Sequence, residues 1–186
     1  MLSMLPTASS GTPPSLDNCI IRIANGEEDA LTTLYRQART AVYGFALSIV
    51  KNVHDAEDIL QDTFLVVWQK AGSYRPNGKP MAWLMTITRR LAIDRLREHT
   101  RTVPLSPEDW QTWLSERPDA TQEDRLILSS LLEQLGDQER QIVILHALTG
   151  LKHREIAELL AIPLPTVLSK YNRALKKLQK SWKESD

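Results

Sequence analysis

The segment from residue 164 to residue 183 carries cationic and short polar side chains, a combination that can bind a DNA duplex. Two prolines, Pro163 and Pro165, interrupt the helical pattern around its start. Pro163 lacks a backbone donor and should end the preceding helix, whereas Pro165 suits the first position of the next one. A short helix, a turn and a basic helix form a helix-turn-helix, which places its second helix in the major groove. The pattern therefore predicts a DNA-reading unit.

The second helix of this unit has two different sides. Apolar residues follow each other at the three-to-four-residue spacing of a helical seam: Val167, Tyr171, Ala174, Leu178 and Trp182. The other side is polar and mostly cationic: Ser169, Lys170, Arg173, Lys176, Lys177, Lys180 and Lys183. Side chains near the start of such a helix reach base edges, and later ones reach phosphates. The alternative is a solvated basic face on an ordinary C-terminal helix, where lysines favour the negative end of the helix dipole.

The chain as a whole is formally neutral, with 23 Lys and Arg residues and 23 Asp and Glu residues. Between residues 150 and 183, however, eight basic residues outnumber two acidic ones. A neutral protein is poorly equipped to hold duplex DNA unaided, because affinity depends on neutralising phosphates. We therefore expect a protein that binds DNA while a larger assembly holds it.

The same composition disfavours other classes of protein. Residues 1–16 are rich in Ser, Thr and Pro and lack an apolar run, which indicates a disordered tail rather than a signal peptide. No stretch approaches the roughly 20 apolar residues that cross a bilayer. Cys19 is the only cysteine, so neither a disulfide framework nor a cysteine-based zinc site is available. We expect a cytoplasmic protein.

Helical periodicity runs through almost every segment, and no segment shows the two-residue period of a strand. We expect a helix that begins near Glu27 and is broken by Asn52 and Val53, a second that begins at about Asp55 and exposes Gln69, and a third from 80 to 98. A loop rich in Gly and Pro at residues 72–80 separates the last two of them.

These helices group into two units. The first is a helical bundle over residues 17–99, and the second is a four-helix domain over residues 121–184. A proline-containing linker at residues 100–120 joins them, and its Trp110 and Trp113 are typical of an element that docks on a neighbour. The sequence thus predicts an all-α protein of two small helical domains.

The outer face of the helix at 80–98 combines an aromatic ring with guanidinium groups. One stripe holds Trp83, Thr86, Arg89 or Arg90, Ile93 and Arg97, beside a loop that ends in Lys79. Single-stranded nucleic acid is bound by this combination, because bases stack on rings and phosphates meet cations. The alternative is that Trp83 anchors the core and that Asp94 pairs with Arg90 and Arg97 on a solvated face.

Two of these segments and the C-terminal unit together resemble a known family. The segments DAEDILQDTFLVVW (55–68) and AWLMTITRRLAIDRLR (82–97) closely resemble region 2 of bacterial sigma-70-family factors of the extracytoplasmic-function group. Residues 135–178 resemble region 4 of the same factors. The resemblance implies a dissociable subunit of RNA polymerase. Its first domain would dock on core polymerase and capture the melted minus-10 promoter element, and its second would read the duplex minus-35 element, with the linker threading through the core enzyme between them.

Carried over by position, the resemblance implies three sets of contacts. The polymerase-binding set is Asp58, Gln61 and Asp62. The set on minus-10 DNA is Ser73, Lys79, Trp83, Thr86, Arg89, Arg90 and Arg97. The set on minus-35 DNA is Arg154, Thr166, Ser169, Lys170, Arg173 and Lys177. An anti-sigma factor that wraps both domains is a further expected partner.

The sequence departs from the family pattern at several of these positions. Pro165 stands where Gly is frequent, Leu168 where a basic residue is frequent, and Arg90 where Asn is frequent. Leu168 can touch a thymine methyl group but can neither hydrogen-bond a base nor neutralise a phosphate. Lys152 replaces the Ser or Thr that commonly caps the following helix. The departures bear on promoter preference and leave the polymerase-binding set unchanged.

Two other functions remain open. One is a helix-turn-helix transcriptional regulator that does not act as a polymerase subunit. The other is an enzyme, because His54, Glu57 and Asp58 are spaced to share a helix face and to ligate a metal ion. A carboxylate site in a bundle needs a matching set on a facing helix, and no such set is evident. The sequence also lacks a glycine-rich phosphate loop and a nucleophile paired with a base. We therefore expect no catalysis, no metal site and no cofactor.

Overall fold

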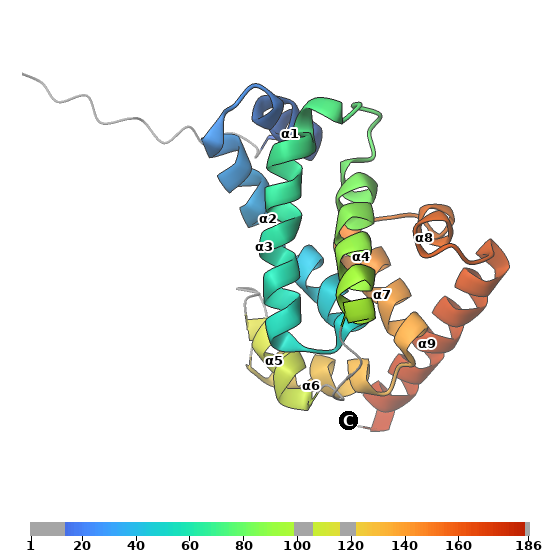
Figure 1. Cartoon of the computed structure of the whole chain (residues 1–186). Coiled ribbons are helices and arrows are strands. Elements are labelled where there is room, and N and C mark those ends of the chain that lie inside the picture. Colours follow the sequence, from blue (N-terminus) through green and yellow to red (C-terminus); the bar gives the residue numbers. More distant parts are fainter. Residues whose placement is uncertain (1–13, 99–105, 116–121, 185–186) are drawn as a thin grey trace, which may run out of the picture.

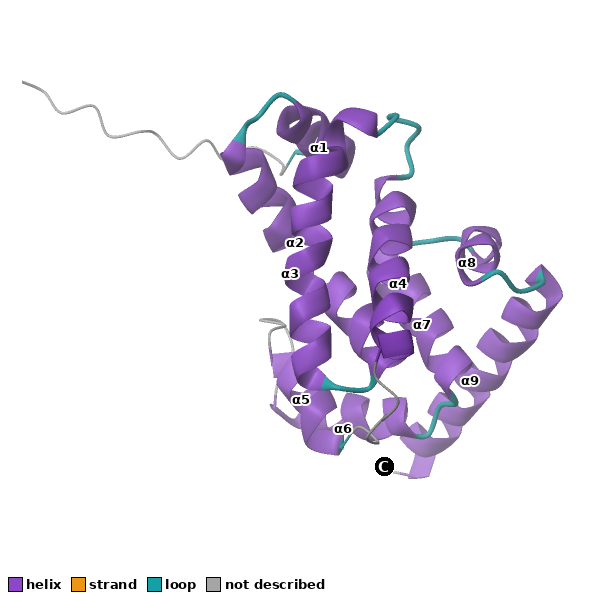
Figure 2. Cartoon of the chain, viewed as in Figure 1, coloured by secondary structure: helices purple, strands orange, loops and turns teal. Residues whose placement is uncertain are grey.

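The computed structural model describes residues 14–98, 106–115 and 122–184. These residues form nine α-helices and one short 3-10 helix, with no strand among them (Figure 2). The predicted all-α fold is therefore confirmed for the described residues, whereas the tail predicted at 1–16 falls largely outside them. None of the described helices combines the length and the apolar character needed to cross a bilayer.

The N-terminal half is a bundle built around one long helix. Its elements are α1 (Leu16–Ala24), α2 (Glu28–Val50), α3 (Val53–Lys70), η1 (Ala71–Ser73) and α4 (Pro80–Glu98). Helix α2 packs against α1, α3 and α4 (Figure 1). Asn52 separates α2 from α3, and its Oδ1 accepts a hydrogen bond from the Asp55 amide at 3.0 Å, which caps α3. The three helices expected in this half are thus present.

Helix α1 was not expected from the sequence. It begins after Ser15, whose Oγ accepts a hydrogen bond from the Asn18 amide at 3.2 Å. Its apolar side buries Cys19, Ile20 and Ile23. A helix of nine residues offers little periodicity to recognise, and here it directly follows the segment read as a tail.

The linker contains the docking element that its two tryptophans predicted. Helix α5 (Pro107–Ser115) buries both Trp110 and Trp113. The Trp113 indole donates a hydrogen bond from Nε1 to the Thr40 carbonyl of α2 at 2.9 Å. Its ring lies so close to Gly44 that a Cβ there would be 2.3 Å from Cζ2. Trp110 lies under the guanidinium of Arg140, 5.3 Å from the ring centroid.

The C-terminal half contains the helix-turn-helix. Its helices are α6 (Gln122–Glu133), α7 (Asp137–Thr149), α8 (His153–Leu160) and α9 (Leu164–Glu184). Ala161 adopts the left-handed conformation that ends α8, and α9 then starts at Leu164, so Pro165 is its second residue rather than its first. Val167 and Ala174 of the predicted seam are buried. The side chain of Trp182, the last seam residue, lies outside the described part.

The two halves pack against each other. Helix α2 contacts α7, and α8 contacts α4 on the right of the view in Figure 1. An ion pair joins Lys51 Nζ at the end of α2 to Asp137 Oδ2 at the start of α7, at 2.6 Å. This packing brings the helix-turn-helix alongside the cationic face of α4.

Candidate nucleic-acid interface

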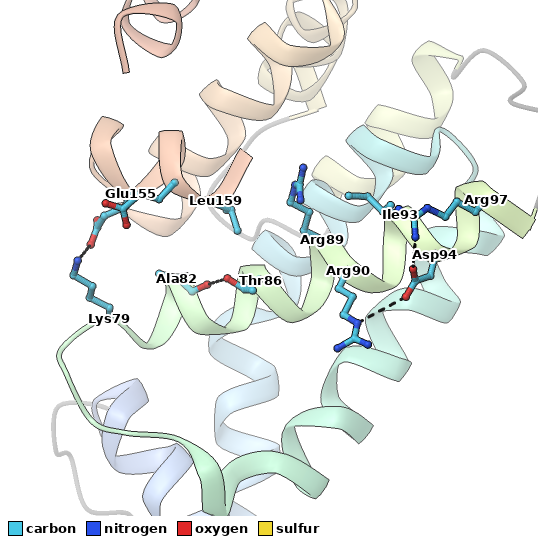
Figure 3. Close-up of a pocket in the computed structure, with 11 residues that line it drawn as sticks. Lys79, Ala82, Thr86, Arg89, Arg90, Ile93, Asp94, Arg97, Glu155 and Leu159 are labelled. Carbon is cyan, nitrogen blue, oxygen red and sulfur yellow. Dashed lines mark hydrogen bonds and ion pairs between the residues drawn. The ribbon is translucent and has the colours of Figure 1, made fainter. Parts of the chain in front are cut away.

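Helix α4 and helix α8 enclose a pocket of about 560 Å³ (Figure 3). From the α4 side it is lined by Lys79, Ala82, Thr86, Arg89, Arg90, Ile93, Asp94 and Arg97. From the α8 side it is lined by Glu155, Glu158 and Leu159. The pocket therefore gathers five of the seven residues expected to bind minus-10 DNA, and four of these five are cationic.

The arginines of this pocket have weak or exposed partners. Asp94 lies 4.0 Å from Arg90 Nε and 3.7 Å from Arg97 Nη1, as the solvated-face alternative expected. Arg89 reaches the carbonyl of Leu160, at the end of α8, at 3.5 Å. Exposed ion pairs of this kind contribute little, about 0–1 kcal/mol each. The guanidinium groups therefore remain available to a ligand that carries phosphates.

Trp83 lies apart from the pocket. Its half-buried ring packs against Tyr74, with 5.0 Å between the ring centroids. The Tyr74 hydroxyl donates a hydrogen bond to Asp17 of α1, and burial together with this carboxylate raises the pKa of the phenol well above its ordinary value. Trp83 thus anchors the base of the loop before α4, and its contact with DNA stays a prediction.

The loop between η1 and α4 is held at both ends. Ser73 is exposed in η1 and donates from Oγ to the Lys70 carbonyl at 2.8 Å. At the other end, Asn77 Oδ1 accepts the Lys79 amide at 3.1 Å, and Gly78 has a positive φ of 74°. Both ends of the loop are therefore shaped by local hydrogen bonds, and its cationic end opens on the pocket.

The residues expected to bind polymerase lie on α3. Asp58 and Gln61 are exposed and Asp62 is half-buried. Arg95 of α4 forms ion pairs at the start of this stripe: its Nη1 lies 3.1 Å from Asp55 Oδ1 and 3.3 Å from Asp58 Oδ2. The stripe continues into two apolar residues that the sequence analysis did not select, Leu65 at 59% exposure and Trp68 at 39%. Their spacing from Gln61, four and seven residues, is the signal that would have found them.

Helix α9 presents most of the residues expected to bind minus-35 DNA. Ser169 and Arg173 are exposed, and Thr166 and Lys170 are half-buried. Arg154, the second residue of α8, is also exposed. Asn172 and Lys176, which were not selected, are exposed as well.

Lys177 has a partner inside the fold. Its Nζ lies 2.6 Å from Oε2 of Glu139 on α7, and Arg173 Nε lies 3.9 Å from the same carboxylate. The side chain of Glu139 is only 6% exposed. Burial acts to raise the pKa of Glu139, but the hydrogen bonds from Lys177 and from the Gly136 amide hold it below its ordinary value. Lys177 therefore stabilises the packing of α9 on α7.

Three aromatic rings meet beneath the helix-turn-helix. His146 and His153 are stacked, with 4.6 Å between centroids, and Tyr171 of α9 packs edge-on against both. Burial, and then the neighbouring His146, lower the pKa of His153. This cluster could not be predicted from the sequence, because its members come from three different helices.

Comparison with known proteins places both halves in one family. The model of sigma-70 region 2 matches residues 34–102, and that of sigma-70 region 4 matches residues 125–178. RNA polymerase sigma factor CarQ of Myxococcus xanthus is 35% identical, over 85% of this chain and 92% of its own. The chain belongs to the sigma-70 family. ECF RNA polymerase sigma factor SigK of Mycobacterium sp. (strain KMS) is 28% identical, over 88% of this chain and 89% of its own.

Solved structures share the fold of this sigma factor. CnrH in complex with the cytosolic domain of CnrY matches with a TM-score of 0.60 and 22% identity, over 92% of this chain and all of that one. The sigma factor RpoE from Bartonella quintana, in complex with the anti-sigma factor NepR, matches with a TM-score of 0.61 and 22% identity. The match covers 82% of this chain and 96% of that one. The resemblance read from the sequence, to a sigma factor of the extracytoplasmic-function group, is confirmed.

Proposed function

We propose that this sigma factor binds core RNA polymerase through α3 and recognises promoters through α4 and α9. The observation that carries the proposal is the presence, in one neutral chain, of two separate cationic faces and of a stripe on α3 that is both acidic and apolar. We name the stripe Asp58, Gln61, Asp62, Leu65 and Trp68 the α3 stripe. An apolar patch with a charged rim is the usual anatomy of a protein interface. The α3 stripe docks on the polymerase.

The face on α4 binds the melted minus-10 strand. Lys79, Arg89, Arg90 and Arg97 supply positive charge at the pocket, and Ser73 lies at the other end of the adjoining loop. An unpaired base held in this loop, with its phosphates on the arginines, is stabilised relative to the paired base. Binding energy of this kind opens the duplex without any covalent step.

The face on α9 binds the duplex minus-35 element. Ser169 and Arg173 face the groove, and Thr166 and Lys170 flank them. Arg154 at the start of α8 meets a phosphate. Lys176 contacts a phosphate in place of Lys177, which was expected to contact minus-35 DNA, because Lys177 is engaged by Glu139.

An anti-sigma factor is a further partner in this proposal. The RpoE structure of Bartonella quintana contains one. In this chain the α3 stripe leaves apolar surface uncovered that such an inhibitor can bind in competition with polymerase. Action in the cytoplasm and the absence of catalysis follow from the same role. Among the described residues, no three His, Cys, Asp or Glu side chains gather as a metal site would require.

A charge reversal on α3 distinguishes this role from a regulator that does not join polymerase. Asp58→Arg and Asp62→Arg, tested singly, should weaken the binding of core polymerase at least about tenfold, because each puts a cation in the docking face. Glu28→Arg on α2 makes the same charge change at an exposed residue outside the three expected contact sets and is the matched control. Binding is measured by titrating labelled core polymerase. Unchanged affinity in both α3 variants would favour the separate regulator.

A further inference from the structure

The first turns of α9 expose apolar side chains where a DNA-reading helix meets base edges. Leu164 is 36% exposed and Leu168 is 40% exposed, and Pro165 between them is exposed as well. Single exposed leucines are ordinary on protein surfaces and need no explanation. Here, however, three exposed apolar residues fall in five positions at the start of a helix whose later turns are cationic.

The position of Leu168 on α9 follows from the buried seam. Val167 is fully buried, and each residue of an α-helix advances by about 100° around the axis. Leu168 therefore lies a quarter-turn from the seam, on the stripe that continues through exposed Asn172 to exposed Lys176. It also adjoins Ser169, which faces solvent. Leu168 belongs to the side of α9 that faces the groove.

Neighbouring helices leave this end of α9 open. In Figure 1 the start of α9 lies at the outer edge of the molecule, beyond α8 as seen from α4. Ser169 uses its hydroxyl locally, donating to the Thr166 carbonyl at 3.1 Å. Pro165 has no backbone N–H to offer a phosphate. The exposed surface of the first turns of α9 is therefore mainly apolar, whereas Arg173 and Lys176 supply positive charge in the later turns.

We propose that Leu168 reads the C5-methyl group of a thymine in the minus-35 element. The inference rests on the proposed function, because it assumes that α9 enters the major groove. In that groove the thymine methyl is the one apolar group on the base edges, and aliphatic and other apolar side chains contact it. Burying one such methyl favours thymine over the same base without it by about fourfold.

Deoxyuridine provides the test, because it pairs like thymine and lacks only the methyl group. Holoenzyme reconstituted from core polymerase and this chain is incubated with promoter duplexes whose minus-35 segment is randomised, and the bound fraction is sequenced. A second library carries deoxyuridine in place of thymine. The wild type should enrich thymine at one or two adjacent positions, and deoxyuridine should reduce that enrichment about fourfold per methyl.

Three variants sharpen the result. Leu168→Ala should enrich thymine and deoxyuridine equally at that position, and Leu168→Arg should shift the preference toward guanine, which arginine contacts bidentately. Leu128→Ala removes a leucine of 38% exposure from α6 and should behave as the wild type. Core polymerase affinity is measured in parallel for each variant.

Two outcomes overturn the inference alone. In one, the holoenzyme selects a minus-35 sequence but treats thymine and deoxyuridine alike. In the other, Leu168→Ala lowers polymerase affinity and keeps the thymine preference, which would make Leu168 a protein-docking residue. A holoenzyme that selects no minus-35 sequence at all would instead reject the proposed function itself, and the inference with it.

Discussion

The ammonium group of Lys79 lies 3.4 Å from the carboxylate of Glu155 and joins the loop before α4 to the first turn of α8. The same carboxylate accepts the Lys152 amide at 2.9 Å, so it supplies the Glu half of a capping box at the start of α8, where Lys152 lacks the usual Ser or Thr side chain. This backbone hydrogen bond, and then Lys79, lower the pKa of Glu155. A negative charge of α8 thus occupies the cationic pocket that we assign to minus-10 DNA.

Glu155→Gln should increase the affinity of the free chain for a single-stranded minus-10 oligonucleotide. Glutamine can still cap α8, whereas the charge that competes with phosphate is removed. We expect a gain of about two- to fivefold, which is the size of effect that one ion pair near the protein surface produces. Fluorescence anisotropy at several salt concentrations measures it. Glu158→Gln removes a charge from the same pocket without breaking this ion pair and should have the smaller effect; an equal or weaker affinity for Glu155→Gln would contradict the prediction.

Truncation of two neighbouring lysines of α9, Lys176 and Lys177, should affect different properties of the protein. Lys177→Ala leaves the buried Glu139 carboxylate with the Gly136 amide and the distant Arg173 as partners, and should lower the free energy of unfolding by about 1–3 kcal/mol. Lys176→Ala should change stability by less than about 0.5 kcal/mol and reduce the salt slope of promoter binding by about one. Urea unfolding and salt titration of holoenzyme binding separate the two. Equal stability of both variants would show that Glu139 does not need Lys177.

Lys176 and Lys177 also show which features of the fold can be predicted from the sequence and which cannot. Periodicity and the two prolines predicted α9 and its two sides, because they are local signals. Which lysine faces inward is decided by Glu139 on α7, 38 residues earlier in the sequence. The packing of α8 on α4 is equally non-local, and so Lys79 was expected to meet DNA while its contact with Glu155 was not expected. Leu65 and Trp68 were missed for a different reason: their apolar character alone suggests a core position.

Gly44→Ala should disturb the docking of the linker helix on α2. The new Cβ would lie 2.3 Å from Trp113 Cζ2, and a ring of this size has to shift to accommodate it. Overpacking of this kind costs about 1–3 kcal/mol. Urea unfolding measures the loss, and tryptophan fluorescence reports the environment of the ring. Gly72→Ala, where a Cβ meets open space, is the control and should stay within about 0.5 kcal/mol of the wild type. A Gly44→Ala protein as stable as this control would contradict the packing described for α5.

Stability should fall in mildly acidic solution because of His153. An imidazole in the unfolded chain takes up a proton near pH 6.5, whereas burial lowers the pKa of His153 in the fold. Below about pH 6.5 the unfolded state therefore binds more protons, and the free energy of unfolding decreases as the pH falls toward the folded-state pKa. Thermal unfolding between about pH 7.5 and about pH 5.5 measures this change.

His153→Phe should flatten this pH dependence, because phenylalanine keeps a ring against Tyr171 and does not titrate. His54→Gln alters an exposed histidine and should leave the dependence intact. If the wild type and His153→Phe lost stability equally on acidification, another group would have to be responsible.

The claim on which these results depend is that the chain acts as a subunit of RNA polymerase. Run-off transcription tests it most directly: core polymerase, this chain and a library of genomic promoter fragments are combined, and the transcripts are sequenced. The account predicts defined transcripts that require the chain and share minus-10 and minus-35 elements at a fixed spacing upstream. It would be contradicted if purified chain, free of any inhibitor, neither associated with core polymerase nor changed its transcripts.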